Sequence, residues 1–271
     1  LKSSAMVKMQ QILFKGIHAA DLLEDIVRRF RPYAQDRPAV DALKAARLED
    51  LGRLVAAGAD LRQLQEWGRE TVSRFKAIKL AHHERFPLIL YIGEIYMRQH
   101  DPYTDFVIHR LEENGLEVVR DPITDWLFYV NKMNLRNAKR DLGMGLRSGD
   151  FRRMLRSTGK AGKSILKGKY MAHIAEKLAE PFHEVLEGRH VLPHPMEIIE
   201  TLEAAHETHG NIEGESPLST GIAYYLMHEM VHPHGDAYIS GIFHVGPFTC
   251  MQEGVATAKI EAMVKEYRKK K

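Results

Sequence analysis

Two histidines and a glutamate in the C-terminal third have the spacing of a zinc-hydrolase motif. Residues 228–232 read H-E-x-x-H. On a helix, this spacing places His228 and His232 on one face, where they bind one zinc ion while Glu229 activates a bound water as a base. Pro233 directly follows and predicts that the helix stops there, and the longer metzincin form of the motif is not matched. A zinc-dependent hydrolase is therefore kept as an alternative function.

The single cysteine, Cys250, is the second candidate for chemistry. The apolar run 237–248 predicts a strand that ends at Gly246-Pro247, and 253–267 has the pattern of an amphipathic helix. A thiol between the carboxyl end of a strand and the amino end of a helix lies in a positive field that favours the reactive thiolate. Ligands of open α/β sheets also bind there. A buried, inert cysteine is the alternative interpretation.

A third stretch, 159–164, reads G-K-A-G-K-S and ends like a phosphate-binding loop. The full G-x-x-x-x-G-K-S pattern needs glycine at position 157, where the chain has Ser157, and no predicted strand precedes it. The glycines at 143, 145 and 149 miss the G-x-G-x-x-G spacing by one residue. We therefore predict no nucleotide-binding loop here.

Composition bounds the class of protein. The 271 residues are 44% hydrophobic and 28% charged, as in ordinary globular proteins of one or two domains. No apolar run approaches the ~20 residues of a membrane helix, and the N-terminal residues lack the apolar core of a signal peptide. One cysteine excludes an internal disulfide and indicates a reducing cytoplasm. Because the chain begins with Leu1, we expect a fragment of a longer protein.

Charge is distributed unevenly. Residues 131–170 contain twelve Lys and Arg against two Asp, a local charge of +10, while the rest of the chain carries 27 basic and 34 acidic residues. Such a stretch is typical of a surface that binds phosphates or an acidic protein. Its only aromatic residues are Phe151 and Tyr170, so base stacking on nucleic acid is not expected. A solvated helical face is the alternative.

Hydrophobic periodicity divides the chain into four segments. Residues 1–85 read as helices, with Asp60 as a helix N-cap. Residues 86–131 read as a first α/β lobe: a buried strand at 87–96, a helix from Thr104 to 114, a strand at 116–119 and the start of a further helix. A strand, a helix and a strand within about 35 residues predict a parallel pair.

The remaining segments are a basic helical insertion, 132–189, and a second α/β lobe, 190–271, which we expect to be truncated. This second lobe contains predicted helices at 196–208 and 217–232, the strand at 237–248 and the final helix. The expected fold class is α/β, with Rossmann-like parallel β-sheet lobes, a helical N-terminal part and the basic helical insertion.

Several stretches together resemble one protein family. They are G-I-H-A-A-D-L-L (16–23), Y-I-G-E-I-Y-M-R (91–98), D-F-V-I-H-R-L-E-E-N-G-L-E-V-V (105–119), D-W-L-F-Y-V-N (125–131) and G-I-F-H-V-G-P-F-T-C-M (241–251). They are similar to the C-terminal part of the large 2-hydroxyacyl-CoA dehydratase activase-like proteins, which are related to the 2-hydroxyglutaryl-CoA dehydratase activators. The resemblance covers most of 12–131 and 214–268, and 132–213 matches poorly.

The resemblance implies a fold and a function. Family relatives include the iron–sulfur subunits of the dehydratases, which are built from Rossmann-like lobes, and their activator partners use ATP to deliver an electron at very low potential to a [4Fe–4S] centre. By resemblance, this chain is an accessory or electron-transfer domain. Cys250 is then the cluster-associated cysteine, and Glu94, Tyr96 and Arg98 line the crevice at the end of the first strand.

The resemblance also implies partners. These are an ATP-binding activase region or a dehydratase subunit, with CoA phosphates at the basic insertion, in the cytoplasm and in anaerobic metabolism. The chain departs from the family because four thiolates usually hold such a cluster and it has one cysteine. The other ligands are expected from elsewhere. No complete active site is evident, so an enzymatic activity stays open, beside the zinc hydrolase and a non-catalytic module that binds phosphates or a partner.

Overall fold

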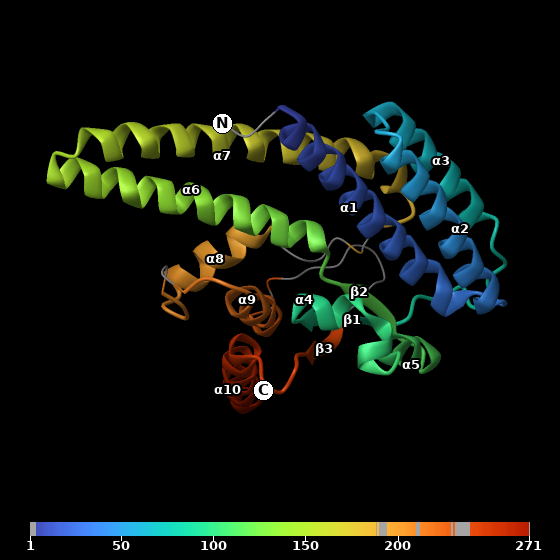
Figure 1. Ribbon diagram of the computed structural model, residues 1–271. Coiled ribbons are helices and arrows are strands. Elements are labelled where there is room, and N and C mark those ends of the chain that lie inside the picture. Colours follow the sequence, from blue (N-terminus) through green and yellow to red (C-terminus); the bar gives the residue numbers. More distant parts are fainter. Residues whose placement is uncertain are drawn as a thin grey trace.

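The computed structural model describes residues 4–187, 189, 194–209, 212–228, 230 and 239–270. These residues form a mostly helical protein with a small sheet of three parallel strands (Figure 1). The predicted α/β class is confirmed at this level. No helix in the described part of the chain is both long and apolar enough to cross a membrane.

Three helices form the N-terminal part: α1 (Ser4–Phe30), α2 (Arg37–Ala56) and α3 (Leu61–Lys76). The predicted cap of α3 is confirmed, because the Asp60 side chain accepts from the Gln63 amide while the Gln63 side chain accepts from the Asp60 amide. This reciprocal arrangement satisfies two amide groups that the helix start leaves without partners.

A long hairpin of two helices follows the first two strands along the chain. It consists of α6 (Ile123–Ser148) and α7 (Phe151–Ala179), and Figure 1 shows its far end projecting beyond the other elements. Gly149 ends α6 in the left-handed conformation, with φ of 68°, and Asp150 caps α7 by accepting from the Arg153 amide. The carboxyl end of α7 shares one apolar core with α1 and α3. The basic stretch 131–170 therefore lies on this hairpin.

The sheet contains β1 (Leu88–Gly93), β2 (Glu117–Arg120) and β3 (Ile239–Val245). Their order is β2-β1-β3, and both pairs are parallel. The predicted parallel pair is thus confirmed. The strands assigned to two separate lobes pair within one sheet, with β1 in the centre.

Alternation along β1 places apolar side chains on both faces of the sheet. Leu90 and Ile92 belong to a core with α8 (Pro195–Ala204), α9 (Ser216–Met227) and Ile260 of α10 (Met251–Lys270). Tyr91 points to the opposite face, where it packs with Ile108 of α5 (Val107–Glu113). This period of two is that of a strand buried on both faces.

Near the carboxyl end of β1, two boundaries differ from those predicted from the sequence. The strand expected at 87–96 ends at Gly93, because Glu94 caps a short helix, α4 (Ile95–Gln99), by accepting from the Met97 amide at 2.8 Å. The helix expected from Thr104 begins only at Val107. A 3-10 turn (Asp101–Thr104) comes first, and Asp105 and Phe106, with φ of 51° and 52°, break the helical path.

Buried ion pairs join the helical part to the amino end of the sheet. Glu117, at the start of β2, is fully buried and accepts from Arg189 at 2.5 Å and from the Tyr33 hydroxyl at 2.5 Å. Arg31 contacts the equally buried Glu112. Burying such charges is costly unless each is paired. These buried ion pairs therefore hold the amino end of the sheet against the helices.

Candidate functional site

The carboxyl ends of β1 and β3 lie side by side. The Glu94 amide, one residue beyond β1, donates to the carbonyl of Val245, the last residue of β3, at 2.9 Å. Gly93 has φ of 127°, and a Cβ there would lie 1.8 Å from the Val245 oxygen, so only glycine fits. In the order β2-β1-β3, the chain adds β2 on one side of β1 and later adds β3 on the other side. The direction in which strands are added therefore reverses between β1 and β3. Parallel sheets bind ligands outside the carboxyl ends of the strands at such a point.

Cys250 lies at this edge of the sheet. The chain leaves β3 at Val245 and reaches Cys250 immediately before α10. The Cys250 amide donates to the Pro247 carbonyl at 2.9 Å, and the Cys250 carbonyl accepts from the Gly254 amide at 2.9 Å. The residue is half-buried. The predicted placement, between a strand's carboxyl end and a helix's amino end, is therefore confirmed.

The three residues expected to line the crevice have different surroundings. Glu94 turns its carboxylate back to cap α4. Arg98 is only 3% exposed and is held by backbone carbonyls and a carboxylate. Tyr96 is 53% exposed and stacks against His100, with ring centroids 5.3 Å apart. Of the three, only Tyr96 is open to a ligand, while the other two shape the strand end.

Arg98 is the central cation of this edge. Its Nη1 donates to the Gly93 carbonyl at 2.6 Å and lies 3.0 Å from Oδ2 of Asp121, and its Nε donates to the Asp121 carbonyl at 3.1 Å. Asp121 follows β2 directly, so one guanidinium ties the ends of β1 and β2 together. Asp121 is not among the residues predicted from the sequence, although its place directly after the second predicted strand was a usable signal.

Carboxyl groups are in excess around Arg98. Burial raises the pKa of Asp121, and it raises the pKa of Asp125, in the first turn of α6, well above the ordinary value, with the field of Asp121 adding to the effect. Burial also raises the pKa of Glu215, whose carboxylate accepts from the Ile95 amide. Carboxyl groups in such surroundings keep a proton to higher pH, so they can act as proton donors.

A histidine–glutamate pair completes the edge. His244, in β3, has its Nε2 2.5 Å from Oε2 of Glu253, in α10. Glu253 is 2% exposed, and its Oε1 has no hydrogen-bond partner among the residues that the structure describes. The pair joins β3 to α10 one turn from Cys250.

The donor set of this edge does not fit an iron–sulfur cluster held by this chain alone. A [4Fe–4S] cluster takes four thiolates, and the sequence has one cysteine. Within the described ranges, no group of three or more His, Cys, Asp and Glu side chains is arranged to hold a metal ion. The arrangement can supply one thiol and several carboxyl groups whose pKa burial raises.

The H-E-x-x-H motif lies only partly within the described residues. His228 and Met230 are described, whereas Glu229 and His232 are outside the described ranges. The helix expected at 217–232 is α9, which ends at Met227. The His228 ring stacks on Tyr224, and its Nδ1 contacts the Tyr224 carbonyl at 2.9 Å. His228 thus follows the helix as its C-cap, so it does not occupy the helical position that the motif requires.

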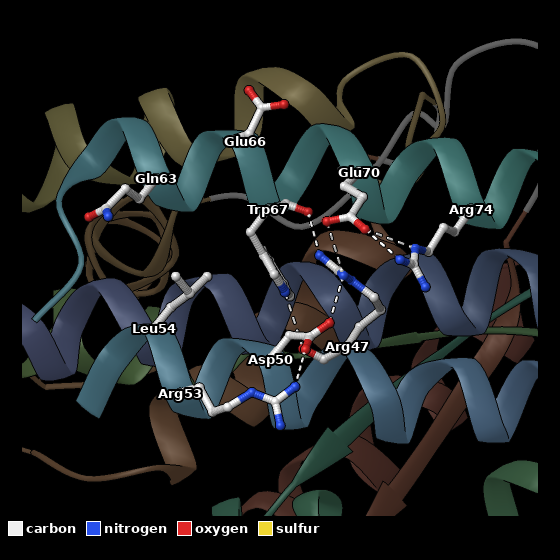
Figure 2. Close-up of a pocket in the computed structure, with 9 residues that line it drawn as sticks. All are labelled: Arg47, Asp50, Arg53, Leu54, Gln63, Glu66, Trp67, Glu70 and Arg74. Carbon is white, nitrogen blue, oxygen red and sulfur yellow. Dashed lines mark hydrogen bonds and ion pairs between the residues drawn. The ribbon is translucent and has the colours of Figure 1, made fainter. Parts of the chain in front are cut away.

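A hollow of about 580 Å³ lies elsewhere, between α2 and α3. Figure 2 shows that its charged side chains contact one another: Arg47 contacts Asp50 and Glu70, and Glu70 also contacts Arg74. Arg47 further donates to the Trp67 carbonyl at 3.1 Å. These charges are already paired within the protein, so the hollow is part of the packing of the two helices.

Comparison with known proteins adds no relative to this description. No protein-family model, no curated protein and no solved structure matches the chain.

Proposed function

We propose that this chain is an accessory or electron-transfer domain of a 2-hydroxyacyl-CoA dehydratase activase-like protein, with its site at the carboxyl edge of the sheet. One observation supports this most. The two stretches that carry the resemblance, 91–98 and 241–251, are far apart in the sequence, yet the Glu94 amide and the Val245 carbonyl join them by a hydrogen bond of 2.9 Å. The parallel order β2-β1-β3 supports a Rossmann-like description of the sheet as part of this proposal.

In this proposal, Cys250 supplies one ligand of an iron–sulfur group, and the other ligands come from further chains. A dehydratase subunit or an ATP-binding activase region are the partners that the resemblance implies. Arg98 and the buried carboxyl groups around it hold the strand ends in place, and Tyr96 offers an exposed ring beside them.

Anaerobic reconstitution with iron and sulfide tests this proposal. We expect sulfur-to-iron absorbance and bound iron that depend on Cys250, so Cys250→Ser loses both. Because each chain brings one thiolate, the iron-loaded species should elute from a sizing column as an assembly of several chains. A Ser variant that loads as much iron as the wild type, or a wild type that takes up none, contradicts the proposal.

A further inference from the structure

A polar groove runs between the two helices of the basic hairpin. Its volume is about 360 Å³. One wall is formed by lysines of α7 and the other by asparagines of α6: Lys160, Lys163 and Lys167 face Asn131, Asn134 and Asn137. We refer to these six residues as the lysine groove. It lies outside the carboxyl edge of the sheet.

Helix geometry explains why these side chains share one groove. The lysines are spaced i, i+3 and i+7 and the asparagines i, i+3 and i+6, so each set forms a row on one helical face. Asn131 donates from Nδ2 to the Ser164 carbonyl at 3.0 Å, which fixes the two helices relative to each other. The three lysines extend over about 10 Å of helix, at 1.5 Å per residue.

The positive charge of this groove exceeds the negative charge within it. Lys160, Lys163 and Lys167 are exposed, and none forms an ion pair with a described residue. The carboxylate in the groove, Asp141, is 2.9 Å from Arg153, whose hydrogen bond lowers the pKa of Asp141. The charge of Lys160 also lowers the pKa of Asp141, so this one carboxylate faces Arg153 and three exposed lysines, and the groove keeps a net positive charge.

Lys160, Lys163 and Ser164, from the stretch that ends like a phosphate loop, line this groove. α7 is continuous through 159–164, so the backbone amides are used within the helix and no phosphate loop exists there. Gly159 and Gly162 stand beside the lysines, and a Cβ at either would meet no atom within 4 Å. Glycine weakens a helix interior, and packing does not require it here. Neither glycine lines the lysine groove.

We propose that the lysine groove binds an extended chain of phosphate groups, as found in inorganic polyphosphate or in the pyrophosphate arm of a coenzyme. Lysine ammonium groups are point charges that suit phosphate oxygens, and the exposed Asn134 amide adds a neutral donor. A row of three charges over about 10 Å matches several phosphate groups in line better than one. This inference does not depend on the proposed role of Cys250.

Titration calorimetry of the whole chain with inorganic tripolyphosphate at low salt tests the site. We expect saturable binding that Lys163→Gln and Lys167→Gln each weaken roughly three- to tenfold, as loss of one charged hydrogen bond at an exposed site implies. Lys139→Gln and Lys169→Gln remove the same charge from exposed positions on the same helices outside the groove. They should change the affinity less than twofold.

Two further measurements distinguish binding in the lysine groove from nonspecific electrostatic attraction. Asn134→Ala keeps the charge and should still weaken binding, whereas orthophosphate should bind more weakly than tripolyphosphate. Competition by coenzyme A identifies a coenzyme's phosphates as the source, and its absence identifies inorganic or nucleotide polyphosphate. Helical circular dichroism checks that each variant is folded. Equal weakening by groove and control lysines, or no tripolyphosphate binding at low salt, overturns the proposal.

Discussion

The Glu94 amide donates a hydrogen bond to the Val245 carbonyl at 2.9 Å, which closes the sheet at the carboxyl ends of β1 and β3. This contact requires the chain to turn at Gly93, whose φ of 127° and closeness to the Val245 oxygen leave no room for a Cβ. The same edge carries Cys250 before α10. The position of the thiol therefore depends on how β1 and β3 end.

Gly93→Ala should destabilise the protein by on the order of 3 kcal/mol or more, because it adds both backbone strain and a clash with a carbonyl. Urea unfolding followed by circular dichroism measures the change. Gly143→Ala is the matched control, since a Cβ at this helical position meets nothing within 4 Å. Equal stability of the two variants would be inconsistent with the contact described.

The buried ion pair between Glu117 and Arg189 leads to a second prediction. Glu117→Gln leaves Arg189 buried without its carboxylate, so we expect a loss of about 3–5 kcal/mol in unfolding free energy. Glu113→Gln, four residues earlier and exposed, should change stability by less than about 0.5 kcal/mol. Denaturant unfolding of the two variants, measured side by side, gives both free energies. If Glu117→Gln is as stable as the wild type, the ion pair with Arg189 does not stabilise the fold.

Asp21 should make the free energy of unfolding depend on pH. Burial raises the pKa of Asp21 from 3.8 to about 6, although its carboxylate accepts from the Ile123 and Thr124 amides at the start of α6. Between these pH values the folded state holds a proton that the unfolded state has released. Stability should therefore fall by about 3 kcal/mol as pH rises from about 4 to about 6, and then level off.

Asp21→Asn should remove this decline, because asparagine does not titrate. The measurement is the difference between the two unfolding free energies across that pH range. Glu24 acts with the opposite sign, because Arg28 and Arg120 lower its pKa to about 2, so its contribution is lost only as pH falls from 4.5 towards 2. A variant with the wild-type slope between pH 4 and 6 contradicts the assignment to Asp21.

Gly162→Ala should stabilise the protein. Gly162 lies inside α7, and a Cβ there meets no neighbour within 4 Å. Alanine should then gain roughly 0.5–1 kcal/mol from helix propensity alone. Thermal unfolding measures the gain, and a loss of stability would mean that the position is packed. Because Gly162 does not line the lysine groove, the same variant should keep its tripolyphosphate affinity.

The sequence predicted the three strands, their parallel pairing for β1 and β2, the cap at Asp60 and the position of Cys250, because each depends on local pattern. It did not predict the partners of the strand ends. Arg98 meets Asp121 only because β1 lies beside β2, and Glu215 reaches the Ile95 amide across 120 residues. Such contacts follow from the packing of distant elements, which periodicity does not describe.

The end of α9 shows a smaller limit of sequence reasoning. Pro233 predicts that the helix stops before it, but α9 already ends at Met227. The His228 ring nitrogen contacts the Tyr224 carbonyl, and the Met230 amide donates to the Tyr225 carbonyl at 2.9 Å. These two contacts occupy carbonyls at the helix end. They satisfy terminal carbonyls that the end of a helix leaves without partners.

The alkylation rate of Cys250 tests the central claim most directly, because this single thiol reports on the carboxyl edge of the sheet. Iodoacetamide should modify it in the folded protein within about tenfold of the rate in urea, as expected for a half-buried thiol at a helix start. Intact mass measured over time gives both rates. Modification that occurs only after unfolding would mean that the sulfur is sealed in the interior, and would contradict a functional thiol at this edge.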